Sequence, residues 1–176
     1  FTVASIVSTT GFSTADFDMW PELSRTIIVL IMFIGACAGS TGGGIKVSRI
    51  IILFKSMAKE LSVMIHPKQV RKITVDSHAI DHETVRSVNV YMVCYIMVFV
   101  ISMGVMSFDN YDLITNFTAV AATLNNVGPG LEMVGPIQNF GFMSSPTKLI
   151  LIFDMLAGRL ELFPMLLLFA PATWKK

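Results

Sequence analysis

Two short runs, each with a glycine after small polar residues, have the composition of loops that coordinate a cation through backbone carbonyls. Gly11 lies in the run STTGFST, and Gly128 lies in the run NNVGPG. In an extended loop, successive carbonyls can face one axis and replace the hydration shell of a cation, and glycine adopts the backbone angles that this requires. The small polar residues, which can hydrogen-bond the outer side of each loop, are Thr9 and Thr10 in the first run and Asn125 and Asn126 in the second. Two loops cannot surround an ion, so we expect further repeats or other subunits to complete a ring of four.

A second kind of glycine-rich run, residues 39–44 (GSTGGG), interrupts the long apolar segment 26–54. Three consecutive glycines cost about 1 kcal/mol each in a helix interior, so we expect the helix to break there. Non-helical backbone at membrane depth is tolerated where it lines a cavity, which favours an intramembrane constriction that gates permeation. The alternative is a glycine hinge that only kinks the helix. A phosphate-binding loop is disfavoured because Ile45 separates Gly44 from Lys46.

A single arginine, Arg159, lies inside the last apolar segment. A charged side chain at that depth costs a few kcal/mol on insertion scales and marks an interior or pathway position. Its guanidinium could donate to carbonyls of the glycine-rich run and stabilise a closed form, while its charge opposes a passing cation. A structural ion pair with Asp154 or Glu161 is the alternative, and the two roles are compatible.

The composition places these residues in a membrane protein. Of the 176 residues, 53% are hydrophobic and 14% are charged, with a mean hydropathy of +0.68, whereas soluble domains carry about 25% charged residues. This excludes a disordered chain and a protein that binds nucleic acid through a broad cationic surface. Cys37 and Cys94 lie in apolar runs, which predicts small buried hydrophobes and not a disulfide or a metal site. Catalytic and metal-ligand spacings are missing from the apolar segments, so we expect neither an enzyme nor a covalent or organic cofactor.

Two segments, residues 85–107 and 149–170, are long and apolar enough to cross a bilayer. Two shorter apolar stretches, residues 1–10 and 116–124, have half that length and run into the two glycine-containing loops. This pattern predicts re-entrant pore helices. Taken singly, each loop could be an interfacial turn.

An internal repeat favours the pore-helix interpretation. Aligning Gly11 with Gly128 sets VASIVSTTGF against VAATLNNVGP. The repeated unit is a span, a pore helix with its loop, and a second span, and the first copy lacks its leading span. Because the chain also begins with Phe1 in the middle of an element, we expect it to be part of a longer polypeptide.

Charged residues predict the orientation. Acidic residues cluster near the two loops, whereas basic residues lie between the first two spans and after the last one: Lys46, Arg49, Lys55, Lys59, Lys68, Arg71, Lys72, Lys175 and Lys176. By the positive-inside rule, the basic linker is cytoplasmic and the loops open to the outside.

Four strings carry a resemblance to a known family: ASIVSTTGFSTADFDMWP, GACAGSTGGGIKVSRI, FTAVAATLNNVGPGL and AGRLELF. Their order and their coverage of most of the chain resemble the second half of the TrkH/KtrB group, closer to TrkH, within the Trk/Ktr/HKT potassium transporter superfamily. The resemblance implies an all-α membrane protein with four potassium-channel-like repeats of transmembrane helix, re-entrant pore helix with filter loop, and transmembrane helix. Residues 1–61 then form the third repeat without its first span, residues 62–84 a cytoplasmic linker, and residues 85–176 the fourth repeat.

The resemblance also assigns roles to residues. It implies that the filter strands, where potassium binds, comprise Thr9, Thr10, Gly11 and Phe12 in the third repeat and Asn126, Val127, Gly128 and Pro129 in the fourth. It implies that the gate comprises Gly39, Ser40, Thr41, Gly42, Gly43, Gly44 and the pore arginine Arg159. The implied partners are the first two repeats of the same polypeptide, a second copy in a homodimer, and a cytosolic RCK-type nucleotide-binding ring.

The function that follows is potassium uptake across the bacterial inner membrane. A membrane potential contributes about 2.3 kcal/mol per charge per 100 mV, which suffices to drive cation entry. The filter strands lack the TVGYG string of potassium channels, so the sequence leaves sodium open as a second ion. The alternative is a non-transporting membrane scaffold subunit that packs with partner helices and tolerates bulky residues at the loop glycines.

Overall fold

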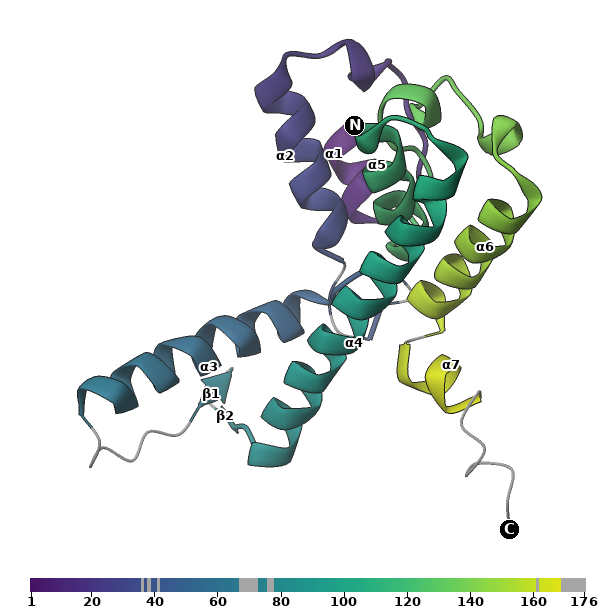
Figure 1. The fold of residues 1–176 in the computed structure, drawn as a ribbon. Coiled ribbons are helices and arrows are strands. Elements are labelled where there is room, and N and C mark those ends of the chain that lie inside the picture. Colours follow the sequence, from purple (N-terminus) through teal and green to yellow (C-terminus); the bar gives the residue numbers. More distant parts are fainter. Residues whose placement is uncertain are drawn as a thin grey trace.

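The computed structural model describes residues 1–35, 37, 39–40, 42–66, 73–75, 78–160 and 162–168. Several residues singled out above lie outside this part of the chain: Thr41, Lys68, Arg71, Lys72, Glu161, Lys175 and Lys176. The described residues are mainly helical. Figure 1 shows α4 crossing the molecule, with α1, α2, α5 and α6 gathered around its upper half and α3 extending away from its middle.

The first copy of the repeat contains three α-helices and a short turn. In order, these elements are α1 (Thr2–Val7), the 3₁₀ turn η1 (Phe17–Met19), α2 (Glu22–Phe33) and α3 (Val47–Ile65). The predicted break within the long apolar segment is present, since residues 34–46 connect α2 to α3 without a helix in their described part. We call this connection the glycine loop. Its two ends lie side by side, with the Gly35 amide donating to the Ile45 carbonyl at 2.8 Å.

A small hairpin packs between α3 and the start of α4. Its strands, β1 (Thr74–Val75) and β2 (His78–Ala79), pair antiparallel. Lys55 Nζ on α3 donates to the Thr74 carbonyl at 2.6 Å. A separate apolar core lies beneath the hairpin, formed by Ile52, Ile73, Val85 and Val88. α3 continues to Ile65, beyond the apolar stretch that ends at residue 54.

The second copy is longer. Its elements are α4 (His82–Met106), η2 (Ser107–Asp109), α5 (Leu113–Leu124), η3 (Glu132–Val134), η4 (Phe140–Phe142), α6 (Ser145–Arg159) and α7 (Leu162–Leu168). The 28 residues from His82 to Asp109 form the one helix of the described part that is long and apolar enough to cross a membrane. α5 occupies the centre of the fold, and all of its residues from Thr115 onward except Phe117 are buried.

The segment 149–170, predicted as the last span, does not form a single helix in its described part. α6 ends at Arg159, and a separate helix, α7, begins at Leu162. Pro164 explains the interruption, because a proline lacks the amide hydrogen for the i−4 bond and its ring collides with that carbonyl. Within the first turn of a new helix the same proline is tolerated, and Pro164 occupies the third position of α7.

The close packing of α6 on α5 depends on a missing side chain. A β-carbon on Gly158 would collide with the Leu124 carbonyl oxygen and lie 2.9 Å from Asn126 Nδ2. Small residues in α5, among them Ala119, Ala121 and Ala122, are fully buried and let the two helices approach. The end of α5, where the second candidate loop begins, is therefore fixed in position by α6.

We expect Gly158→Ala to lower the thermal midpoint of unfolding of the purified protein. Overpacking of this kind costs about 1–3 kcal/mol. The matched control is Gly104→Ala in α4, where an added β-carbon meets no atom within 4 Å and helix propensity favours alanine by up to about 1 kcal/mol. Equal midpoints for the two variants would contradict the packing argument.

Candidate ion-conducting site

The two predicted half-helices end in loops with the same hydrogen-bond pattern. We call residues 8–12 the Gly11 loop and residues 125–129 the Gly128 loop. In the Gly11 loop, the amides of Thr10 and Gly11 both point to the Ser5 carbonyl, at 2.9 and 3.5 Å. In the Gly128 loop, the amides of Val127 and Gly128 both point to the Ala122 carbonyl, at 2.8 and 3.4 Å. Ser5 and Ala122 are equivalent in the repeat alignment, so the internal repeat of the sequence is also a repeat of backbone geometry.

The backbone angles repeat as well. Thr9 and Asn126, which are equivalent in the repeat, have φ values of 54° and 55°. Gly11 and Gly128 have φ values of 78° and 107°, which residues with a side chain rarely adopt. Each loop therefore turns back through one strained non-glycine residue and one glycine.

This pattern sets the direction of the loop carbonyls. In a trans peptide the C=O and N–H groups point in opposite directions. Because the amides of residues 10, 11, 127 and 128 point back at their own half-helices, the carbonyls of Thr9, Thr10, Asn126 and Val127 point away from them. In the part of the chain that the structure describes, these carbonyls accept no hydrogen bond from the protein. They are available to a cation.

The two loops lie against each other. A β-carbon on Gly11 would collide with the Val127 carbonyl oxygen and lie 3.5 Å from Pro129 Cδ. A β-carbon on Gly128 would lie 3.9 Å from the Gly11 Cα. Apolar packing continues the contact, because Val127 and Leu131 share a buried cluster with residues of α1, η1 and α2. The structure thus brings together two runs separated by more than 100 residues.

The eight residues assigned to filter strands differ in exposure. Val127 is buried, whereas Thr10, Phe12 and Gly128 are exposed and the others are intermediate. The polar residues before the glycines also differ in their contacts. Asn126 Nδ2 donates to the Met155 carbonyl of α6 at 2.9 Å, while the Thr10 hydroxyl contacts the Ser8 hydroxyl at 2.7 Å.

The glycine loop packs directly beneath the Gly128 loop. A β-carbon on Gly43 would collide with the Asn125 carbonyl oxygen and lie 2.8 Å from the Asn126 Cβ. A β-carbon on Gly44 would lie 3.0 Å from Asn125 Oδ1. Of the six residues assigned to the gate in this run, Gly43 and Gly44 therefore touch the candidate filter, and Gly39 lies in open space.

Arg159 and the glycine loop line one small cavity of about 30 Å³. Ser40, Gly42 and Gly44 form one wall, and Gly158 and Arg159 form another. Arg159 forms no ion pair with Asp154, so the part of the structural alternative that involves Asp154 is wrong. Asp154 is fully buried and accepts a hydrogen bond from Ser102 Oγ on α4 at 2.8 Å. The other candidate partner, Glu161, lies outside the described residues.

Sequence reasoning missed a buried aromatic support of the Gly128 loop. The Tyr95 hydroxyl on α4 donates to Asn125 Oδ1 at 2.8 Å, and Asn125 Nδ2 donates to the Ala121 carbonyl at 2.8 Å. Tyr91 stacks on Tyr95, and the Arg49 guanidinium lies 4.0 Å from the centre of the Tyr91 ring. The signal was two tyrosines four residues apart within an apolar span, since a buried tyrosine hydroxyl usually needs a partner.

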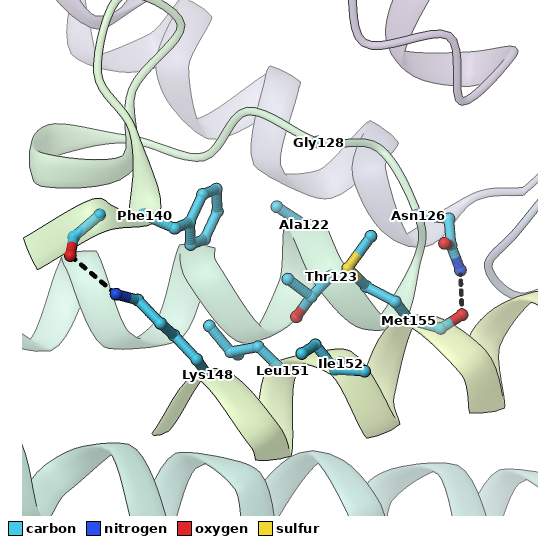
Figure 2. A pocket seen from close by; sticks show the side chains of 10 residues that line it. Ala122, Thr123, Asn126, Gly128, Phe140, Lys148, Leu151, Ile152 and Met155 are labelled. Carbon is cyan, nitrogen blue, oxygen red and sulfur yellow. Dashed lines mark hydrogen bonds between the residues drawn. The ribbon is translucent and has the colours of Figure 1, made fainter. Parts of the chain in front are cut away.

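A larger apolar cavity of about 490 Å³ opens beside the Gly128 loop. Figure 2 shows Leu151, Ile152 and Met155 of α6 facing Ala122 and Thr123 of α5, with Asn126 at one end. Lys148 closes the other end, where Nζ donates to the Gly141 carbonyl at 2.8 Å. The described part of the chain thus leaves one side of the candidate filter uncovered.

Comparisons with known proteins agree with this architecture. The TrkH family, described as cation transport proteins, matches residues 1–176. The chain is 41% identical to the Trk system potassium uptake protein TrkH of Salmonella typhimurium over 176 residues, which are 100% of this chain and 36% of that protein. It is 32% identical to the Trk system potassium uptake protein TrkG of Escherichia coli K12 over 175 residues, 99% of this chain and 36% of that protein. The crystal structure of the potassium transporter TrkH from Vibrio parahaemolyticus matches with a TM-score of 0.86 and 42% sequence identity over 97% of this chain and 36% of that one.

Fold and loops together define an all-α membrane protein built from potassium-channel-like repeats. The chain belongs to the TrkH family of cation transport proteins, which are transporters and not enzymes. The resemblance stated from the four sequence strings is therefore confirmed. The chain spans 36% of the length of the curated relatives described here.

We expect Tyr95→Phe to reduce stability by ~1–3 kcal/mol, because it leaves the buried Asn125 amide oxygen without its donor. The matched control is Tyr111→Phe, which removes a hydrogen bond of 3.0 Å to the partly exposed Phe142 carbonyl. Water can replace that donor, so the control should lose less. Thermal unfolding of both variants checks the prediction, and an unchanged midpoint for Tyr95→Phe would contradict it.

Proposed function

We propose that this chain forms the third and fourth repeats of a potassium uptake protein and supplies half of its selectivity filter. The observation that carries the proposal is the pair of loops with matching hydrogen-bond patterns, which lie against each other across the repeat boundary and whose outward carbonyls accept no hydrogen bond from the described residues. Relatives named as potassium uptake proteins support potassium as the ion.

In the proposed mechanism the loop carbonyls replace water around a potassium ion. The relevant oxygens belong to Thr9, Thr10, Asn126 and Val127, whose peptide units are held by hydrogen bonds on the helix side. Such preorganisation matters because carbonyls that are already oriented need not be ordered when the ion loses its hydration shell. An inside-negative membrane potential then drives the ion inward at about 2.3 kcal/mol per 100 mV, without a coupled reaction.

The proposal requires partners. Two loops provide half of a ring, so the first two repeats of the same polypeptide complete the filter, and the open cavity beside the Gly128 loop is a surface on which they would pack. A homodimer and a cytosolic RCK-type nucleotide-binding ring are further proposed partners. The bacterial inner membrane is the proposed location, with the loops outside and the basic linker inside.

We also propose that the glycine loop and Arg159 form the gate. The loop lies between the Gly128 loop and the cavity that contains Arg159. In the closed state the guanidinium charge opposes a descending cation, and the glycine-rich backbone narrows the path. Opening requires the glycine loop to move away from Asn125. Glycine-rich backbone can change conformation in this way without side-chain strain.

We expect Gly128→Ala in the four-repeat polypeptide to reduce potassium uptake by about tenfold or more, since a side chain at this φ costs about 1–3 kcal/mol and displaces the neighbouring carbonyls. Gly11→Ala should reduce potassium uptake to a similar extent, because its β-carbon would collide with the Val127 carbonyl oxygen. Uptake is measured in cells that lack their own potassium transporters, with Gly104→Ala as control. Normal uptake and ion preference in a folded Gly128→Ala protein would favour the scaffold function.

Arg159→Ala should increase basal potassium flux by roughly fivefold or more, since a unit charge 4 Å from an ion costs about 1 kcal/mol even in bulk water. Deletion within residues 42–44 should act in the same direction. Arg86→Ala is the matched control, because Arg86 is an exposed arginine near the start of α4. Potassium flux into proteoliposomes checks the prediction. An unchanged flux in the Arg159→Ala variant would show that Arg159 is not part of the gate.

A further inference from the structure

One arginine ties the outer parts of the two repeats together. Arg25, in the first turn of α2, forms ion pairs with Glu132 at 2.7 Å, Asp18 at 3.2 Å and Glu22 at 3.3 Å. The Arg25 side chain is 16% exposed, compared with 43% for Glu132 and 80% for Glu22.

The pair with Glu132 crosses the repeat boundary. Glu132 lies in the turn formed by residues 130–135, which we call the Glu132 turn and which directly follows the Gly128 loop. The same turn approaches the first repeat at a second point, because a β-carbon on Gly135 would lie 3.7 Å from Asp18 Cβ. The Arg25 ion pairs thus join the segment after the Gly128 loop to the segment after the Gly11 loop.

The Glu132 turn is also held by apolar packing, since Leu131 and Val134 are buried in two apolar clusters on either side of Glu132. Thr118 Oγ1 on α5 accepts a hydrogen bond from the Leu131 amide at 3.0 Å, and the Gly130 amide donates to the Val134 carbonyl at 2.7 Å. Glu132 itself has a φ of 56°, a strained value for a residue with a side chain. A strained residue persists only where its surroundings hold it. The Gly135 amide donates to the Glu132 carbonyl at 3.0 Å, and the Arg25 pair holds the Glu132 side chain.

We propose that Arg25 and Glu132 are positioning residues for the filter: their ion pair fixes the outer end of the Gly128 loop against the Gly11 loop and thereby sets ion selectivity. This inference rests on the proposed function. The pair touches no loop carbonyl and acts only through the chain, since Glu132 follows Gly128 by four residues. Loss of the pair frees the turn to relax, and the spacing between the two sets of carbonyls changes with it.

The test compares Glu132→Gln with Glu22→Gln in the four-repeat polypeptide. Each variant removes one carboxylate from the same guanidinium, but only Glu132 crosses the repeat boundary. We expect Glu132→Gln to lower the ratio of potassium to sodium flux by about fivefold, in the range of one exposed ion pair, whereas Glu22→Gln stays within about twofold of wild type. Arg25→Lys keeps the charge but lacks the planar guanidinium that contacts three carboxylates, and its flux ratio should lie between those of the two glutamine variants.

The outcomes separate the possible failures. If wild type takes up no potassium, the proposed function fails. If wild type takes up potassium but Glu132→Gln retains its selectivity, the positioning role fails and the function stands. If both glutamine variants lose selectivity equally, the two carboxylates act on the ion through their negative charge alone. That result overturns the positioning role. Should Glu132→Gln fail to fold, Glu132→Gly removes the pair and the backbone strain together, and an unchanged flux ratio there also overturns the proposal.

Discussion

The candidate site depends on the fixed, opposed directions of the N–H and C=O groups of each peptide. Two consecutive amides at the end of each half-helix point back to a single carbonyl, that of Ser5 or Ala122. The carbonyls of the same peptide units must then face away from the helix. No side chain is needed for this orientation, which explains how Thr-Thr-Gly and Asn-Val-Gly produce the same geometry. Side chains instead help to fix where the Gly128 loop lies, since Asn126 donates to the Met155 carbonyl and Asn125 accepts from the Tyr95 hydroxyl.

Close contacts made by glycines connect these loops to their surroundings. Gly11 lies against the Val127 carbonyl, Gly43 against the Asn125 carbonyl, and Gly158 against the Leu124 carbonyl. In each case the backbone of a glycine lies where a side chain would collide with a carbonyl of the Gly128 loop or of the residue before it. The loop is therefore supported on three sides by backbone, and a change in any one neighbour changes the packing of the same few peptide units.

Local features could be predicted from the sequence because they have local causes. The three consecutive glycines within 39–44 predicted the break between α2 and α3, and the matched apolar stretches predicted the half-helices α1 and α5. The break between α6 and α7 was not predicted because Pro164 was overlooked, although its effect is also local. Three features could not be predicted: the seat of Gly43 on Asn125, the Tyr95 hydrogen bond, and the contact between Glu132 and Arg25. Each joins residues at least 30 positions apart, and no periodicity or motif specifies which distant backbone a glycine or an amide will meet.

The position of Asn125 connects the candidate gate to the candidate filter. Its side chain is held by Tyr95 and by the Ala121 carbonyl, and its backbone carbonyl faces Gly43. Movement of the glycine loop removes a neighbour from Asn125 without breaking the two side-chain hydrogen bonds. In the proposed gate, these two hydrogen bonds would let the Gly128 loop keep its shape while the path below it opens. A filter whose carbonyls keep their spacing in both gate states needs two kinds of contact. Contacts from α4 and α5 stay in place, whereas the contact from the glycine loop can be lost. Under the proposed mechanism, the buried Tyr95 hydroxyl would supply the permanent part, because its hydrogen bond to Asn125 is shielded from water.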